Sequence, residues 1–196
     1  EAVSIARDAG GQVDDDEIVI SPTPAGAKAS SDAAGRQGAV GAWRQAFLDL
    51  PFDWNDITGL GVIADTFETS ITWDRWPEFD RVVRGAVQDA MDRVCGDGTV
   101  TARFTHIYPD GPAPYYSFTA LGKPGSELSQ WAEIKQAASE ALIAAGGTIT
   151  HHHAVGRDHR PWYDKQRPES FATALRAAKK SLDPSSILNP GVLIDP

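Results

Sequence analysis

The sequence predicts an α+β fold, with an antiparallel sheet of the ferredoxin-like kind, helices on one face of it, and a helical C-terminal tail. Two long segments have apolar residues at helical spacing, and the shorter segments around them alternate apolar and polar residues. Gly and Pro separate these segments, in the order strand, helix, strand, strand, helix, strand. A chain of 196 residues with 41% hydrophobic residues can build a core around such a sheet.

The first part of the chain, residues 1–56, is expected to form a truncated start and a mobile loop of this domain. Its first residue is Glu rather than Met, and residues 1–11 resemble the back half of a helix that ends in two glycines. Residues 12–42 are rich in Gly, Ala, Ser, Asp and Pro, a composition that cannot bury much surface.

The α+β domain is predicted over residues 57–150 and begins with a strand within residues 60–70. A helix follows, with Pro77 in its first turn and Gly96 as its stop. Its apolar positions are Phe79, Val82, Val83, Ala86, Ala90, Met91 and Val94. Residues 99–108 form the next strand, residues 109–112 a turn, and residues 115–121 the returning partner strand.

A second helix is predicted from a Ser126 cap to the glycines at 146 and 147, and its apolar stripe should cover the two paired strands. Residues 148–153 are expected to form the last strand. The C-terminal segment, residues 151–196, contains a third helix that begins at Pro168 and stops before Pro184. Because this segment is rich in turns and has little core of its own, we expect it to dock on another domain.

Bulk composition excludes some classes of function. The formal net charge is −9 and no segment concentrates Lys and Arg, so nucleic acid is not an expected partner. No apolar run has the length of about 18 residues that spans a bilayer. The single cysteine, Cys95, ends an apolar helical pattern, which indicates a packed thiol in a reducing, cytoplasmic setting. Peripheral membrane contact and a homodimer stay open.

Three adjacent histidines, His151, His152 and His153, are the most unusual local feature. On an extended backbone the first and third point to one face and the second to the other, so the three cannot share one ion. No second cluster of Cys, Asp or Glu has ligand spacing, and no metal site is predicted. Surface polar residues are one interpretation of the triplet. Catalysis is the favoured one, because imidazoles can donate to a developing anion or move a proton near neutral pH.

The two paired strands offer further candidates. Alternation places Tyr115 and Tyr116 on opposite faces, so one is core and the other can act as a general acid, although packing is the commoner role of a strand tyrosine. On the preceding strand His106 is expected on the same side as Phe104. Arg103 lies on the other, polar side, which suits either an anionic group or solvent.

Several motifs follow one another along residues 65–193. They are Asp65-Thr66-Phe67-Glu68-Thr69-Ser70, then Trp73-Asp74-Arg75, then Arg103-Phe104-Thr105-His106-Ile107-Tyr108 with Tyr115, and finally the histidine triplet. In this order and nearly this spacing they resemble the alkyldihydroxyacetonephosphate synthases and their bacterial FAD-linked oxidase relatives.

The resemblance implies a two-domain flavoenzyme. An N-terminal FAD domain, absent from this chain, would bind most of the FAD, and a C-terminal cap domain would shape the substrate side. This chain is similar to the cap domain plus the tail that returns to the FAD domain, so alone it is expected to be inactive. In the synthases a fatty alcohol replaces the acyl group of acyl-dihydroxyacetone phosphate, a step of ether-lipid synthesis without net oxidation.

The resemblance also assigns roles to single residues. Tyr115 matches the proposed acid or base, and the triplet matches the histidines beside the flavin and the substrate headgroup. His153 and Asn189, the latter in a Leu-Asn-Pro-Gly turn, are expected to contact the cofactor. The residues expected to contact substrate are His106, Arg103, Glu68 and Thr69.

One segment departs from the family pattern. Relatives carry Pro-Tyr-Leu-Arg-Asp ahead of the Asp-Thr-Phe-Glu-Thr motif, and its arginine is thought to meet the substrate phosphate, whereas this chain has Trp54 there. Losing that cation weakens phosphate binding unless Arg44 or Arg103 compensates. The nearest alternative is an FAD-linked oxidase or dehydrogenase of a 2-hydroxy acid or an alcohol. A non-catalytic binding domain is the rival from another class.

Overall fold

The computed structural model describes residues 1–12, 14–15, 18 and 38–195, and the chain divides into two compact units, Glu1–Asp56 and Ile57–Pro196. The first unit contains α1 (Ala2–Asp8) and most of α2 (Gly38–Gly59). The mobile loop predicted for residues 12–42 lies largely outside the described residues. For residues 38–42 that prediction is wrong, because α2 begins there, in a stretch that leads into the good helix formers Arg44, Gln45 and Ala46.

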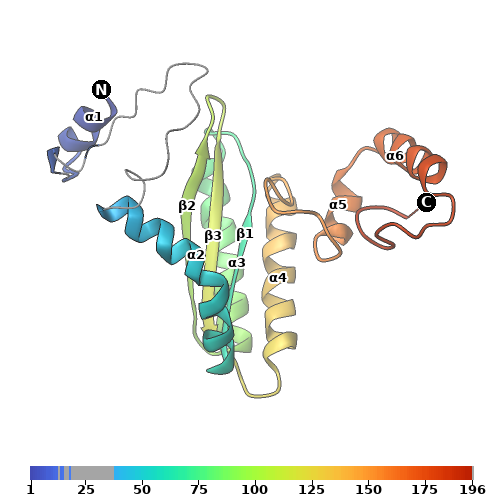
Figure 1. The fold of residues 1–196 in the computed structure, drawn as a ribbon, viewed down its shortest axis with the longest axis horizontal. Coiled ribbons are helices and arrows are strands. Elements are labelled where there is room, and N and C mark those ends of the chain that lie inside the picture. Colours follow the sequence, from blue (N-terminus) through green and yellow to red (C-terminus); the bar gives the residue numbers. More distant parts are fainter. Residues whose placement is uncertain (13, 16–17, 19–37, 196) are drawn as a thin grey trace. The chain divides into compact units, whose positions relative to one another are not determined.

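The second unit is an α+β domain built on a three-stranded antiparallel sheet, shown in Figure 1. Its strands are β1 (Val62–Glu68), β2 (Thr99–Ile107) and β3 (Pro112–Leu121), in the spatial order β1-β3-β2. The helices α3 (Trp76–Val94) and α4 (Glu127–Ala144) supply the other half of its core. The predicted α+β class with an antiparallel sheet is therefore confirmed, and the first five elements occur in the predicted order.

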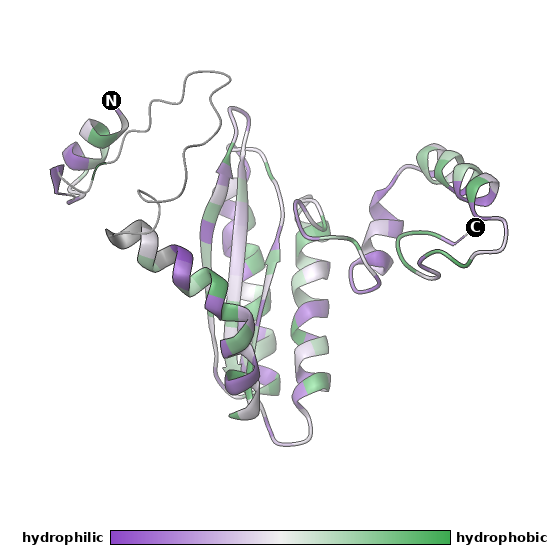
Figure 2. Ribbon diagram, viewed as in Figure 1, coloured by the Kyte–Doolittle hydropathy of each residue, from purple (hydrophilic) through white to green (hydrophobic). Residues whose placement is uncertain are grey.

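The hydrophobic core lies between one face of the sheet and the two helices. Alternation turns Phe67 of β1 and Tyr116 of β3 to this face, where their rings stack with centroids 4.7 Å apart. Other core residues are Ile63, Phe118 and Ala120 from the strands, Val83, Val87 and Met91 from α3, and Ile134 and Leu142 from α4. Figure 2 shows that these helices carry hydrophilic as well as hydrophobic residues. Burial of one sheet face fixes the register, because a one-residue slip would turn every core side chain outward.

Residues 148–153 do not form the predicted last strand. Thr148 is tied to the end of β1 instead, since its N–H donates to the Ser70 carbonyl at 3.3 Å and its carbonyl accepts the Thr69 hydroxyl at 2.6 Å. The following N–H groups converge on a side chain, the Glu68 carboxylate, rather than on a neighbouring strand. The strand prediction is wrong because the backbone curls around this acceptor.

The C-terminal part contains α5 (Arg160–Gln166), which the sequence did not predict, and α6 (Glu169–Leu182), which begins after Pro168 as predicted. The Gln166 side chain ties α5 to the chain ahead of the triplet: it donates to the Gly147 carbonyl at 3.0 Å and accepts the Ile149 N–H at 3.1 Å. Among the described residues, no helix has the length and hydrophobicity that crossing a membrane requires.

Candidate functional site

The sheet face turned away from the core carries a row of three candidate residues. In the ladders Tyr115 of β3 pairs with Glu68 of β1 on one side and with Arg103 of β2 on the other. Paired residues lie on the same face of a sheet, so the phenol stands between a carboxylate and a guanidinium. Alternation along three strands, rather than any local motif, assembles this row.

Tyr115 has polar partners on several sides. Its hydroxyl donates to Thr66 Oγ1 at 3.1 Å, and the guanidinium carbon of Arg103 lies 4.6 Å from the ring centroid. The His153 ring meets it edge-on, with centroids 5.3 Å apart. Tyr116 points the other way, as predicted: it is fully buried and donates to Asp80 Oδ1 at 3.0 Å, and burial raises its pKa far above the usual range.

A β-bulge decides where His106 points. Phe104 pairs with Pro114, but His106 pairs with Ala113, so the register shifts between Phe104 and His106. The Phe104 ring packs edge-on against Trp76 of α3, with centroids 4.9 Å apart, whereas the extra residue at 105 turns His106 to the opposite face. The prediction that Phe104 and His106 share a side is therefore wrong.

The backbone of the triplet surrounds one carboxylate oxygen. The N–H of His151 donates to Glu68 Oε1 at 3.2 Å, and the N–H groups of His152 and His153 donate to the same atom. The curl overturns the predicted alternation of faces. The His151 and His152 rings stack, with centroids 4.2 Å apart and an interplanar angle of 16°, while His153 turns to Tyr115.

His106, His151 and His152 form a compact imidazole cluster. The centroid of His106 lies 4.3 Å from that of His152 and 5.4 Å from that of His151. One ring nitrogen from each can lie within 4.8 Å of the others, and neutral imidazole is a common ligand of zinc and copper. Alternation, the reason for excluding a shared ion from the sequence, does not apply to this curled backbone.

Burial favours the neutral form of the His151 and His153 imidazoles. It lowers the pKa of His151, and the neighbouring His152 and His106 lower it further, while Glu68 opposes them. Burial also lowers the pKa of His153, and the nearby Glu68 carboxylate again opposes this shift. A neutral imidazole has one donor and one acceptor nitrogen, so each ring can hold or pass a proton at neutral pH.

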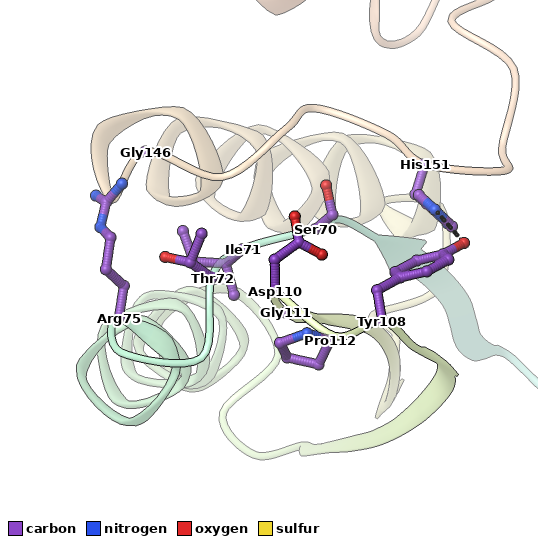
Figure 3. Close-up of a pocket in the computed structure, with 10 residues that line it drawn as sticks. All are labelled: Ser70, Ile71, Thr72, Arg75, Tyr108, Asp110, Gly111, Pro112, Gly146 and His151. Carbon is purple, nitrogen blue, oxygen red and sulfur yellow. Dashed lines mark hydrogen bonds between the residues drawn. The ribbon is translucent and has the colours of Figure 1, made fainter.

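A cavity of about 430 Å³ opens beside His151. Figure 3 shows Tyr108 and His151 at one end, joined by a hydrogen bond of 3.1 Å between Tyr108 Oη and His151 Nε2, and Arg75 at the other end beside Gly146. It is lined by Ser70, Ile71, Thr72, Arg75, Tyr108, Asp110, Gly111, Pro112, Gly146 and His151. The imidazole cluster thus borders a space large enough for part of a small molecule.

Two residues expected at the site lie apart from its exposed face. Thr69 is fully buried, and its hydroxyl is bonded to Thr148, so it links β1 to the triplet segment. Asn189 has a φ of 46° in the C-terminal tail, where its turn is held by a 2.9 Å bond from Arg157 to the Pro190 carbonyl. Contact of Thr69 with substrate and of Asn189 with a cofactor stay predictions.

Three residues to which the sequence assigned no role belong to the site. Thr66 accepts from Tyr115, Tyr108 bonds to His151, and the Lys135 ammonium donates to the Thr66 carbonyl at 2.8 Å. Alternation could have found Thr66, because it stands two residues before Glu68 and shares its face. Lys135 gave no comparable signal, since its helix lies against the opposite face of the sheet.

Comparison with known proteins adds independent findings. The family model described as FAD linked oxidases, C-terminal domain, matches residues 16–193. The alkyldihydroxyacetonephosphate synthase of Trypanosoma brucei brucei is 28% identical over 152 residues, which are 78% of this chain and 25% of that protein. The synthase of the same name from Caenorhabditis elegans is 34% identical over 144 residues, 69% of this chain and 23% of that protein.

A bacterial relative and a solved structure agree with these matches. The uncharacterised FAD-linked oxidoreductase YgcU of Escherichia coli K12 is 30% identical over 137 residues, 68% of this chain and 28% of that protein. A solved alkyldihydroxyacetonephosphate synthase has a TM-score of 0.55 at 17% identity, over 76% of this chain and 24% of that one, which supports the fold. The chain spans about a quarter of the length of the synthases that it matches, at 25% and 23%.

Proposed function

Because the chain belongs to the family of FAD-linked oxidase C-terminal domains, we propose that it forms the substrate side of an FAD-dependent enzyme that exchanges an acyl for an alkyl group. One observation carries the proposal. The Tyr115 ring is contacted by the Arg103 guanidinium and by the His153 ring, and the three residues come from separate parts of the chain. The similarity to alkyldihydroxyacetonephosphate synthases supports the choice of reaction.

The proposed substrate is an acyl-dihydroxyacetone phosphate. The bond between its first carbon and the acyl oxygen breaks, and the oxygen of a fatty alcohol bonds to that carbon instead. The fatty acid leaves as its carboxylate, the proton of the alcohol is released, and no external oxidant or reductant is needed. This overall exchange still requires a proton to be moved at the reacting carbon, which is general acid–base work.

Tyr115 is the residue to which we assign this proton transfer. Its hydroxyl already donates to the Thr66 hydroxyl, and the Thr66 carbonyl in turn accepts a hydrogen bond from the Lys135 ammonium. The exposed Arg103 guanidinium beside the ring suits a phosphate or a developing negative charge. The His153 ring also contacts the Tyr115 ring, and its neutral imidazole can relay the proton.

The donors on this face also suit a flavin. Imidazole and guanidinium N–H groups match the carbonyl-rich pyrimidine edge of the ring, which becomes more negative on reduction. Bound FAD would supply an acceptor for an electron pair from the substrate. We assign His153 and Asn189 to the cofactor side, and an N-terminal FAD domain to most of its binding.

Trp54 favours a second candidate, an FAD-linked oxidase or dehydrogenase of a 2-hydroxy acid or an alcohol. It stands where the resemblance places a phosphate-binding arginine, and such a substrate has no phosphate to bind. The same Tyr115 and imidazoles could take the hydroxyl proton of that substrate. The two candidates differ in whether the substrate leaves the flavin reduced.

The test is anaerobic flavin absorbance of the intact protein that contains this chain. It is mixed first with acyl-dihydroxyacetone phosphate and then with a panel of 2-hydroxy acids and alcohols. Bleaching by the ketone phosphate, and alkyl-dihydroxyacetone phosphate formed on adding a fatty alcohol, is the expected result. Bleaching by a hydroxy acid or an alcohol alone would replace the exchange reaction with an oxidation.

A further inference from the structure

Glu68 provides the acceptor for three consecutive backbone N–H groups. Successive N–H groups form an anion-binding concavity where the chain curls, and here the occupant is a carboxylate of the same chain. Glu68 is the last residue of β1 and is only 3% exposed. Its side chain is therefore enclosed by protein rather than presented to a ligand.

This carboxylate sets the direction of two groups of rings. Each anchored N–H group belongs to the residue whose side chain follows it. The His151 and His152 side chains point towards His106, while the His153 side chain points towards Tyr115. A rotation of the backbone at any of the three residues would separate one pair of rings. The ring contacts thus depend on a backbone that Glu68 holds.

The chain on either side of the triplet has other anchors. Thr148 is bonded to Thr69 and Ser70, Ile149 is bonded to Gln166, and the Thr150 hydroxyl donates to the His153 carbonyl. For the N–H groups of the triplet itself, Glu68 Oε1 is the acceptor. Loss of the carboxylate would leave donors without a partner beside a site that is otherwise in place.

We propose that Glu68 is the positioning residue of this site. Its carboxylate acts without touching substrate, by holding the triplet backbone so that His153 meets Tyr115 and the other two imidazoles meet His106. The part that concerns turnover rests on the proposed function. The part that concerns the backbone rests on the hydrogen bonds alone, so the two parts can fail separately.

Glu68→Gln is the informative variant, because it keeps the size of the side chain and removes its charge. Hydrogen bonds from N–H to an ionised carboxylate are stronger than those to a neutral amide oxygen. The matched control is Asp80→Asn, which neutralises another internal carboxylate of the domain. Asp80 is bonded to Arg84 and Tyr116 on the core side of the sheet, away from the triplet.

The first measurement is amide hydrogen exchange of the intact protein, resolved for residues 148–159. In the unmodified protein the amides of residues 151–153 should be protected although they lie in no helix or strand. In Glu68→Gln they should exchange about tenfold faster or more, and in Asp80→Asn they should not change. Unprotected amides in the unmodified protein would overturn the proposal, and this result needs no variant to fold. Unchanged exchange in a folded Glu68→Gln protein would overturn it too.

The second measurement separates kcat from KM in the same proteins, with acyl-dihydroxyacetone phosphate and a fatty alcohol. Glu68→Gln should lower kcat by about a hundredfold, because small displacements of reacting groups have effects of that size, and should leave KM nearly unchanged. A raised KM with an unchanged kcat would make Glu68 a substrate contact and overturn the positioning role. An unmodified protein without turnover would refute the proposed reaction. Amide hydrogen exchange would still decide whether Glu68 holds the backbone of the triplet.

Discussion

The guanidinium carbon of Arg103 lies 4.6 Å from the centre of the Tyr115 ring. Arg103 reaches this place from β2, and Glu68 flanks the same tyrosine from β1. The phenol is thus set between opposite charges, with Thr66 as its hydrogen-bond acceptor. Each of these neighbours can be removed separately, because each comes from a different position in the ladders.

Tyr115→Phe should lower kcat by about a hundredfold or more while the protein stays folded, since loss of a general acid or base typically costs 10²–10⁴-fold. The ring and its contacts with Arg103 and His153 remain. The control is Tyr116→Phe, which removes the bond to Asp80 from the core and should lower the free energy of unfolding by about 1–3 kcal/mol without changing kcat. Steady-state kinetics and urea unfolding measure both. Equal activity loss in the two variants would argue against a special role of Tyr115.

Arg103→Lys should raise KM for the phosphate-bearing substrate about tenfold with a smaller change in kcat. Lysine keeps the charge, but loses the planar group that lies over Tyr115 and can bind phosphate through two N–H groups. Arg93→Lys is the control, because Arg93 is an exposed residue of α3 that pairs with Glu133 at 3.7 Å. If KM for the phosphate substrate is the same in both variants, Arg103 does not replace the missing arginine at Trp54.

The free energy of unfolding should decrease as the pH falls through about 6.5, the usual histidine value. Burial lowers the pKa of His151 and His153, so the unfolded chain takes up these protons at a higher pH than the folded chain does. The associated stability is complete above the unfolded value and is lost as the pH falls towards the folded values. Urea unfolding at several pH values between 5 and 8 measures this slope, and His153→Gln should reduce it. A stability that rises on acidification would contradict the burial of these rings.

Two acidic residues with lowered pKa values, Asp183 and Asp195, should not obscure that slope. Asp183 and Asp195 have pKa values lowered by hydrogen bonds from Lys179 and Arg160 respectively, below the usual 3.8. Their contribution to stability is present above the unfolded value and is lost only as the pH falls below about 4. The histidines and these two carboxylates therefore change the free energy of unfolding over different ranges of pH.

Gly111→Ala should destabilise the domain and disturb the cavity beside His151. A Cβ at residue 111 would stand 2.0 Å from the Ile71 carbonyl oxygen, a backbone atom that cannot rotate away. We expect a loss of about 1–3 kcal/mol in the free energy of unfolding, as for other overpacked sites. Gly85→Ala, on the exposed side of α3 with nothing within 4 Å of the added carbon, should instead stabilise by about 0.5–1 kcal/mol. Thermal unfolding of both variants provides the comparison, and destabilisation by both would contradict the structure around Gly111.

The parts of the fold that the sequence predicted are those with strong local periodicity. The helices α3 and α4 and the strands β2 and β3 repeat apolar residues at their own period, and each ends at a recognisable glycine, proline or turn. The opposite directions of Tyr115 and Tyr116 followed from alternation alone. Cys95 is likewise packed against the core, as its helical pattern indicated, and burial raises the pKa of its thiol.

The parts that the sequence missed depend on partners far away in the chain. The triplet curls because of a carboxylate 85 residues before His153, and no window of neighbouring residues contains that information. The start of α2 was hidden by a composition that also occurs in loops. The family resemblance pointed to these residues, but the directions of their side chains depend on long-range hydrogen bonds and on one irregularity in β2.

That irregularity makes the number of residues within β2 a property of the site. Thr105 occupies the bulge and its hydroxyl donates to the Ala113 carbonyl at 3.2 Å, which fastens the extra residue to β3. A homologue that lost one residue here could keep every histidine and tyrosine, yet its His106 would face α3 instead of the triplet. In an alignment of this family, a single-residue gap at this place should therefore be weighted as heavily as the replacement of a histidine.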